Sequence, residues 1–181
     1  MEGDERLRLF CALLLPTSAL DLLVSWQRSH LPERTKGLRI VPAENLHVTL
    51  AFLGSVPRGE VPGIREALER STEDRAEIVL TPVGYHETRS VGMIELSDEQ
   101  GRAESLALRL WDGLEKLGVY EREQRRWLPH VTVVRFRERP RLTPVVPDLG
   151  RLVPSDAALM ISRLRPSGAQ YEVLESVSLG G

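Results

Sequence analysis

Two histidines are each followed by a valine and then a threonine, in His47-Val48-Thr49 and in His130-Val131-Thr132, and these two triplets are the H-x-T motifs of interest. Both triplets lie in runs rich in β-branched residues, and residues i and i+2 of a strand point to the same face. Each triplet therefore presents an imidazole and a hydroxyl side by side, while its valine points to the packed face. Two such strands brought together would place two imidazoles and two hydroxyls around one cavity.

This set of groups suits the hydrolysis of a phosphodiester. A base must take a proton from water and an acid must protonate the departing oxygen, and histidine can do either near neutral pH. One imidazole, of His47 or His130, must begin neutral and the other charged. The hydroxyls of Thr49 and Thr132 can donate hydrogen bonds to the nonbridging phosphate oxygens, which hold the phosphorus in line.

Arg135 follows His130 by five residues and has the opposite strand parity. Parity alone predicts a surface arginine. A β-bulge, or the end of the strand, would be needed to bring Arg135 to the cavity, where its guanidinium could bind phosphate with two hydrogen bonds.

The other candidate groups favour simpler interpretations. The sequence predicts that His30 lies on the surface at a helix end and His86 in a solvated loop. Seven arginines fall between Arg122 and Arg141, although the net charge of the chain is only −2. No acidic residue accompanies either H-x-T motif at ligand spacing, and H-x-x-x-H, C-x-x-C and phosphate-binding glycine loops are missing from the sequence. We therefore expect no metal and no cofactor.

The single cysteine, Cys11, excludes a disulfide within the chain and indicates a reducing, cytoplasmic setting. It lies in an apolar stretch, which predicts an inert core residue. No apolar run approaches the roughly 18 residues that a membrane span requires, so no membrane association is expected.

The elements that must position these groups can be assigned from periodicity and from turn residues. Amphipathic spacing predicts three helices, at 17–30, 62–70 and 98–117. The predicted strands are 6–14, 38–41, 46–53 (ended by Gly54), 76–85, 91–96, 128–136, 157–164 and 170–179, with a proline-punctuated loop over 140–154. This order predicts an α+β fold with largely antiparallel sheets, formed by residues 1–181 as a single domain.

Two segments resemble the signatures of the 2H phosphoesterases, and specifically their bacterial and archaeal RNA 2′,3′-cyclic phosphodiesterase branch, historically called 2′-5′ RNA ligases. The first is Asn45-Leu46-His47-Val48-Thr49-Leu50-Ala51-Phe52-Leu53-Gly54, and the second is Pro129-His130-Val131-Thr132-Val133-Val134-Arg135. Weaker similarity at residues 7–12 and 168–172 extends the resemblance from about residue 6 to residue 179.

The resemblance implies a bilobal, pseudo-twofold fold in which two sheets flank a central cleft, with the helices outside and one H-x-T motif per lobe. It implies that His47 donates a proton to the leaving 3′ oxygen and that His130 is the base for the attacking water, which leaves a 2′-phosphomonoester. It also implies that Arg135 contacts phosphate, and that Phe10 can stack on the terminal base. The expected partner is an RNA with a 2′,3′-cyclic phosphate end, bound by a monomer.

Three alternatives remain open at this point. The same histidines could join a cyclic end to a 5′-hydroxyl in reversible 2′-5′ ligation, or they could hydrolyse a small cyclic nucleotide. A third possibility is a non-catalytic module that binds RNA ends through the arginines of 122–141. Residues 84–87 and 91–93 replace an aromatic-rich segment of the family, which leaves base recognition there in doubt.

Overall fold

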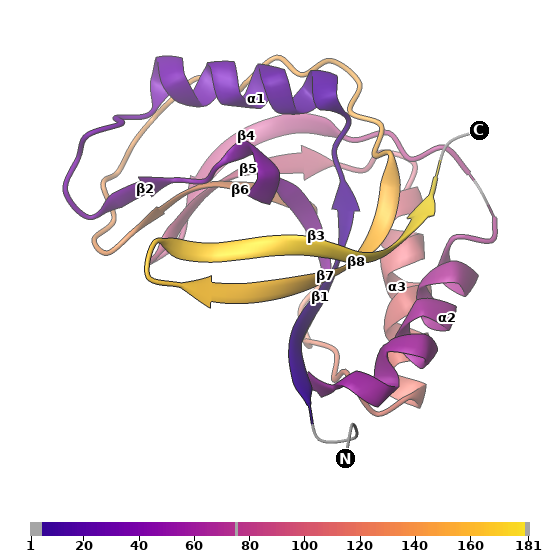
Figure 1. The fold of residues 1–181 in the computed structure, drawn as a ribbon. Helices are drawn as coiled ribbons and strands as arrows, with labels where there is room; N and C mark the ends of the chain where they lie inside the picture. Colours follow the sequence, from indigo (N-terminus) through magenta and orange to yellow (C-terminus); the bar gives the residue numbers. More distant parts are fainter. Residues whose placement is uncertain (1–4, 75, 180–181) are drawn as a thin grey trace.

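The computed structural model describes residues 5–74 and 76–179. Three helices are distributed among eight strands along this described part of the chain (Figure 1). The strands are β1 (Arg6–Leu14), β2 (Leu38–Ile40), β3 (His47–Pro57), β4 (Thr81–Glu87), β5 (Val91–Ser97), β6 (His130–Phe136), β7 (Asp156–Arg165) and β8 (Gly168–Ser178). The helices are α1 (Thr17–His30), α2 (Val61–Ser71) and α3 (Arg102–Lys116), with single 3₁₀ turns at Ala43–Asn45 and Arg58–Glu60.

Eight strands form one curled antiparallel sheet in the order β4-β5-β6-β3-β1-β7-β8, and β2 pairs with β6 outside this path. The expected α+β class is therefore confirmed. The two expected sheets are joined where β3 meets β6, through a single pair of residues, Val48 and Val131. The two groups of strands are not consecutive halves of the chain, since β2 joins the β4–β6 side while β7 and β8 join β1 and β3.

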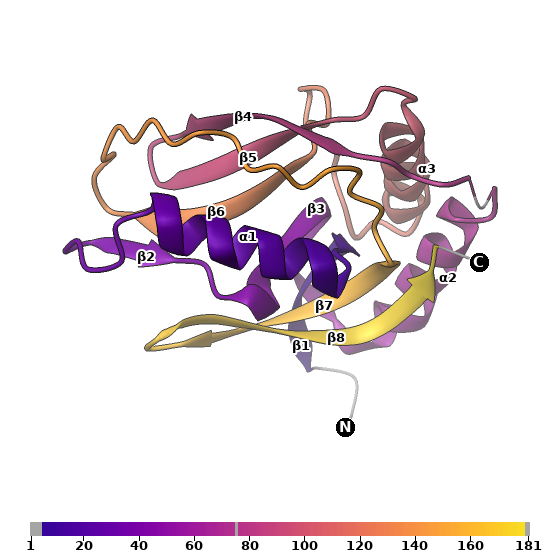
Figure 2. The same cartoon turned by 90° about the horizontal axis from the view of Figure 1, so that it is seen from above.

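The helices lie outside the curled sheet, as expected. Helix α1 runs along one side, and α2 and α3 pack together at the opposite end (Figure 2). Their apolar faces cover one continuous core, which includes Leu23 of α1, Leu68 of α2 and Leu110 of α3. Val48 and Val131 belong to the same core and are fully buried, so the neighbouring residues on both strands face the other side of the sheet. No described helix is long and apolar enough to cross a membrane.

Three predicted boundaries were wrong by four or five residues, and the others agree within two. Strand β3 continues to Pro57, because Gly54 has a positive φ of 69° and the register shift beside it keeps the pairing with β1 intact. Strand β4 begins at Thr81 rather than at residue 76, and it includes His86, which was expected in a loop. Helix α3 begins at Arg102, since Gly101 is left-handed and the Asp98 carboxylate accepts a hydrogen bond from the Glu104 amide at 2.8 Å.

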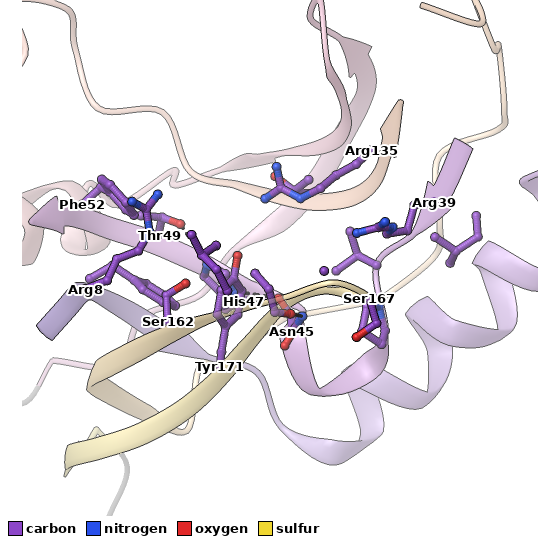
Figure 3. Close-up of a pocket in the computed structure, with 18 residues that line it drawn as sticks. Arg8, Arg39, Asn45, His47, Thr49, Phe52, Arg135, Ser162, Ser167 and Tyr171 are labelled. Carbon is purple, nitrogen blue, oxygen red and sulfur yellow. Dashed lines mark hydrogen bonds between the residues drawn. The ribbon is translucent and has the colours of Figure 1, made fainter. Parts of the chain in front are cut away.

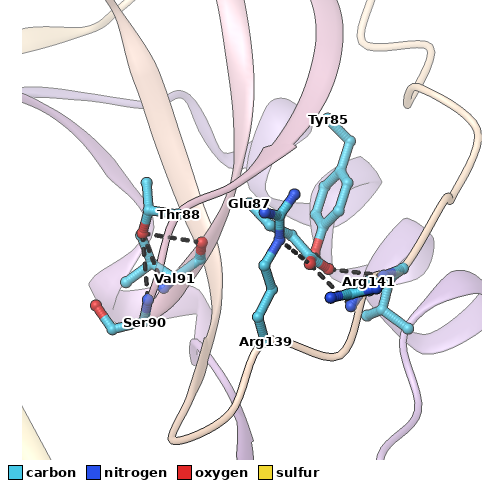
Figure 4. Close-up of polar contacts among 8 residues, drawn as sticks. Tyr85, Glu87, Thr88, Ser90, Val91, Arg139 and Arg141 are labelled. Atoms are coloured by element: carbon cyan, nitrogen blue, oxygen red, sulfur yellow. Dashed lines mark hydrogen bonds and ion pairs between the residues drawn. The ribbon is translucent and has the colours of Figure 1, made fainter.

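The predicted loop over residues 140–154 is confirmed, and a buried carboxylate holds its beginning in place (Figure 4). Glu87, 5 % exposed, accepts hydrogen bonds from the Arg141 amide at 2.9 Å and the Leu142 amide at 2.8 Å. The Tyr85 hydroxyl and Arg139 Nε also donate to it, at 3.0 and 3.2 Å. Arg141 has a positive φ of 57°, which a side-chain-bearing residue adopts at a cost that these contacts offset.

Candidate active site

The two H-x-T motifs meet at the centre of the sheet. Val48 of β3 pairs with Val131 of β6 in antiparallel register. One step further along each strand, this register sets His47 beside Thr132 and Thr49 beside His130. All four side chains lie on the face opposite the buried valines, as the sequence predicted. The site therefore has an approximate twofold axis that passes between the two valines.

Each imidazole is held in the same way. His47 Nδ1 lies 2.7 Å from the carbonyl oxygen of Asn45, and His130 Nδ1 lies 2.9 Å from that of Leu128. A carbonyl oxygen can only accept, so Nδ1 carries the hydrogen in both rings. When either ring is neutral, its Nε2 is left as the basic atom. His47 Nε2 lies 2.9 Å from Thr49 Oγ1, so the hydroxyl can donate to it.

A β-bulge brings Arg135 to the face of the histidines. Strand β5 pairs Met93 with Thr132 and Gly92 with Val134, which leaves Val133 as an extra residue in β6. The extra residue reverses the alternation that follows it, so Arg135 shares the face of Thr132. This is the irregularity that the sequence argument required, and Arg135 lines the cavity.

The buried side chain of Gln27, 3 % exposed, supports this bulge from helix α1. Its amide nitrogen donates to the carbonyl oxygens of Val133 at 2.9 Å and of Val41 at 3.0 Å. Gln27 therefore ties the bulged residue of β6 to the chain that follows β2.

Strand β3 carries a matching bulge. Ala51 pairs with Cys11 and Thr49 with Ala12, so Leu50 is the extra residue. The consequence is that Phe52, five residues after His47, reaches the cavity as Arg135 does five residues after His130. Phe52 is 51 % exposed, and the Arg8 guanidinium lies 4.9 Å from its ring centroid. Sequence reasoning missed Phe52, although the shared spacing of five residues was present as a signal.

Two tryptophans hold β3 where it separates from β6. Trp127 Nε1 donates to the Thr49 carbonyl at 3.1 Å, and Trp111 Nε1 donates to the Leu50 carbonyl at 2.9 Å. These two oxygens lie at the bulge, just beyond the single β3–β6 pair, so the indoles satisfy groups that a neighbouring strand would otherwise bind.

The motifs open into a cavity of about 510 Å³ (Figure 3). His47 and Thr49 lie near its middle, with Phe52 and Arg8 toward one end and Arg39 and Ser167 toward the other. Of the predicted site residues, the lining includes Phe10, His47, Thr49, Thr132 and Arg135. His130 is half-buried beside the cavity and is not part of its lining. The lining residues that sequence reasoning missed include Arg8, Arg39, Asn45, Phe52, Ser162, Ser167 and Tyr171.

Aromatic contacts fix the ring of His47. The Phe10 ring centroid lies 5.0 Å from that of His47, and Tyr171 meets the same imidazole edge-on at 5.5 Å. Phe10 and Tyr171 are themselves 4.8 Å apart. Phe10 is only 3 % exposed, so most of its surface is already used by protein contacts. Arg8 precedes Phe10 by two residues in β1, so strand alternation was the signal in the sequence that could have placed both side chains on one face.

Burial in this cleft lowers the pKa of His47 to about 4. The hydrogen bond to the Asn45 carbonyl opposes this shift, whereas the positive charges of His130 and Arg135 add to it. His47 is therefore neutral at neutral pH in the free protein. An anion bound between these cations would favour the charged imidazolium and raise the pKa.

Four of the seven arginines of 122–141 are in ion pairs. Arg122 pairs with Asp112 and Glu115, Arg125 with Glu123, Arg126 with Glu104, and Arg139 with Glu87. These pairs neutralise four of the seven charges on which the non-catalytic alternative depends. Arg135, Arg137 and Arg141 form no ion pair among the described residues, and Arg135 lines the cleft.

Two H-x-T motifs that face one cleft on a curled antiparallel sheet define the class of 2H phosphoesterases. The sequence profile described as LigT-like phosphoesterase matches residues 13–92. An RNA 2′,3′-cyclic phosphodiesterase of Thermus thermophilus is 34 % identical over 187 residues, which cover 97 % of this chain and 91 % of that relative. The protein of the same name from Archaeoglobus fulgidus is 31 % identical over 76 % of this chain and 82 % of its own. The chain belongs to the LigT-like family of 2H phosphoesterases.

Solved structures agree with this assignment. The crystal structure of a Thermus thermophilus protein superposes with a TM-score of 0.78 at 31 % identity, covering 96 % of this chain and 98 % of the other. Escherichia coli LigT, crystallised with 3′-AMP, gives a TM-score of 0.81 at 23 % identity, covering 98 % of this chain and 100 % of the other. At that identity, the second likeness shows that the fold is shared.

Proposed function

We propose that this protein hydrolyses 2′,3′-cyclic phosphodiester ends of RNA to 2′-phosphomonoesters through His47 and His130. The observation that carries the proposal is the symmetric pair of imidazoles, each fixed through Nδ1 by the carbonyl two residues earlier. The names of the curated relatives from Thermus thermophilus and Archaeoglobus fulgidus support the same substrate.

In the proposed reaction, His130 Nε2 takes a proton from water as the water oxygen bonds to phosphorus. The bond from phosphorus to the 3′ oxygen breaks, and His47 Nε2 gives its proton to that oxygen. Thr49 and Thr132 donate hydrogen bonds to the nonbridging oxygens, and Arg135 stabilises the charge that accumulates on them. Each imidazole ends in the protonation state in which the other began, and proton exchange with solvent resets the pair.

The neutral state of His47 in the free protein is consistent with a role as acid if the substrate supplies the missing charge. A cyclic phosphodiester carries one negative charge, and the cleft would hold it close to the imidazole. This charge opposes the desolvation that lowers the pKa of His47. We propose that binding of the substrate and protonation of His47 are coupled.

We propose different roles for the two phenylalanines of the cleft. The exposed ring of Phe52, with Arg8 beside it, can stack with the terminal base. Phe10 was expected to stack on that base, but its contacts with His47 and Tyr171 suit it better to orienting the catalytic ring. Because each molecule carries both motifs, we propose that it acts as a monomer, in the cytoplasm where RNA ends are processed.

The test is a product assay with a short RNA that ends in a 2′,3′-cyclic phosphate, with EDTA present. Wild type should give a 2′-phosphate. His47→Ala and His130→Ala should each lose about 10²- to 10⁴-fold in kcat, the usual contribution of a general acid or base. His86→Ala is the matched histidine control and should keep full activity, since His86 does not line the cleft.

Full activity in His47→Ala would exclude the mechanism, and a strict need for added metal would exclude metal-free catalysis. Addition of a second RNA with a 5′-hydroxyl tests the ligation alternative. A joined product that exceeds the hydrolysed one would replace hydrolysis as the principal reaction.

A further inference from the structure

A second cavity, of about 810 Å³, adjoins the catalytic cleft. Residues 35–39 form one wall, and the chain from Arg135 to Pro140 forms the other. Arg39 and Arg135 line both cavities, so the groove continues the cleft past the edge of the sheet. The carbonyl of Gly37 accepts a hydrogen bond from the Arg137 amide at 3.1 Å, which keeps the two walls together.

The groove is strongly cationic. Lys36, Arg39, Arg135 and Arg137 line it against one acidic residue, Glu138. Within the described residues, none of the four cationic side chains forms an ion pair or a hydrogen bond. Ten other arginines among the described residues are in ion pairs, namely Arg58, Arg65, Arg70, Arg109, Arg122, Arg125, Arg126, Arg139, Arg151 and Arg163. Other described arginines, among them Arg28, Arg34 and Arg89, also form no ion pair, so the distinctive feature of this groove is that four unneutralised cations line one cavity.

The strand register places like charges opposite one another. Arg39 of β2 is the direct cross-strand partner of Arg135 of β6. Like charges in this position destabilise a sheet unless something neutralises them, and no acidic side chain does so in the described residues. A bound anion would relieve the repulsion, and guanidinium groups bind phosphate with particularly suitable geometry.

We propose that this groove binds the phosphodiester backbone of the nucleotides that precede the cyclic end. The inference rests on the proposed function, because it assigns the path of the same substrate beyond the cleft. An RNA whose terminal phosphate lies at His47 and Thr49 would pass Arg39 and Arg135 and continue between Lys36 and Arg137. The protein should accordingly prefer an oligonucleotide to a cyclic mononucleotide, which cannot reach the groove.

The test compares a ten-nucleotide RNA with a 2′,3′-cyclic end against 2′,3′-cyclic AMP. The variant Lys36→Ala/Arg137→Ala removes two groove charges and leaves Arg39 and Arg135 of the cleft intact. We expect the KM for the oligonucleotide to rise about tenfold at low salt, and the slope of log KM against log salt to fall by about 1.4, for two lost phosphate contacts. The KM for the mononucleotide should not change.

The charge-matched control is Arg65→Ala/Arg70→Ala on helix α2, which lies at the opposite end of the molecule from β2 (Figure 1). This control variant should leave the KM unchanged for both substrates. An unchanged KM for the oligonucleotide in the groove variant would overturn the proposal, and so would an equal rise for both substrates or for both variants.

Direct binding separates this proposal from the proposed function. The dissociation constant of a labelled ten-nucleotide RNA with a 2′-phosphate end is measured for both variants by fluorescence anisotropy. If wild type shows no turnover but the groove variant alone binds more weakly, the groove stands and the hydrolytic function fails. If wild type turns over both substrates and the variants bind equally, the function stands and the groove fails.

Discussion

The ring of His47 illustrates how a cleft can set the protonation state of a proposed general acid before substrate arrives. Desolvation lowers its pKa to about 4, and the nearby charges of His130 and Arg135 act in the same direction. The protein thus keeps an imidazole uncharged among cations until an anion enters. Under the proposed mechanism, His47 can act as an acid only after the negative charge of the substrate has favoured its protonation.

This coupling predicts a shift in the titration of His47. Addition of sulfate, whose charge is constant above pH 3, should raise the pKa of His47 from about 4 toward its ordinary value near 6.5. The sign follows from the stabilisation of imidazolium by a neighbouring anion. Sulfate should also bind more tightly as the pH falls, because the charged ring binds it better. The ¹³Cε1 shift of His47 in NMR titrations reports both states.

The Thr49→Val variant is a suitable control for that titration, because it removes a proposed anion contact without changing the charge. It should reduce the shift at a given sulfate concentration. A pKa of His47 that is the same with saturating sulfate and without it would contradict the coupling.

The exposed ring of Phe52 leads to a second prediction at this scale. Phe52→Ala should raise KM by about tenfold or more, because stacking of a base on an aromatic ring contributes about 1–3 kcal/mol. Phe52→Tyr keeps the π-face and should remain close to wild type. Steady-state kinetics on the RNA substrate measure both. A fall in kcat with KM unchanged would instead indicate that Phe52 shapes the catalytic groups.

At the scale of elements, much of the fold could be predicted from alternation and from turn residues. Strands β1, β7 and β8 and the three helices follow directly from these patterns. The two β-bulges could not be located in this way, because Leu50 and Val133 look like ordinary apolar strand residues. An unpaired residue becomes visible only when the partner strand is known. For the same reason, the sequence could not decide whether Arg135 lies on the surface or in the cleft, and Phe52 was missed.

The groove side chain Arg39 could not be predicted either. It belongs to a three-residue strand whose partner, β6, lies almost a hundred positions later in the chain. Local sequence contains no signal for such a pairing. The ion pairs of the arginines in 122–141 could not be predicted for a related reason, since three of the acidic partners lie on α3.

The buried carboxylate of Glu87 predicts a pH-dependent stability. Burial alone would raise its pKa, but hydrogen bonds from Leu142, Tyr85, Arg139 and Arg141 outweigh it and hold the pKa below its ordinary value. A carboxylate with a depressed folded-state pKa stabilises the fold above the unfolded pKa, near 4.5, and loses that contribution as the pH falls below it. Glu87→Gln should lower the free energy of unfolding by about 1–3 kcal/mol at pH 7, as is typical when buried hydrogen bonds lose their charged acceptor.

The measurement is urea unfolding at pH 7 and at pH 3.5. The difference between wild type and Glu87→Gln should shrink at the lower pH. Glu123→Gln removes an exposed carboxylate from its pair with Arg125 and should have little effect at either pH. A pH-independent difference for Glu87→Gln would show that packing, rather than charge, anchors the loop.

The molecule as a whole combines two pseudo-symmetric groups of strands with one hydrophobic core. That core runs from Leu7 to Ile161 and includes residues from both sides of the cleft. Because strands are exchanged between the two sides, neither side contains a continuous stretch of chain that could fold alone. We therefore expect one cooperative unfolding transition for the whole chain, with coincident midpoints by tryptophan fluorescence and by circular dichroism.

Separate transitions would show that the two sides are distinct domains. Calorimetry gives an independent check, since the van't Hoff and calorimetric enthalpies should agree for a single unit. Independence of the midpoint from protein concentration would support a monomer.

The extra residue in β6 has a consequence for comparing relatives of this protein. If a homologue lacked one valine between Thr132 and Arg135, an alignment would show a single gap and otherwise conserved letters. Yet the arginine would turn from the cleft to the opposite side of the sheet. Within these strands, the number of residues between two conserved positions determines which side of the sheet the second side chain occupies. Conservation of the spacing, as much as of the arginine itself, should mark the homologues that place this arginine in the cleft.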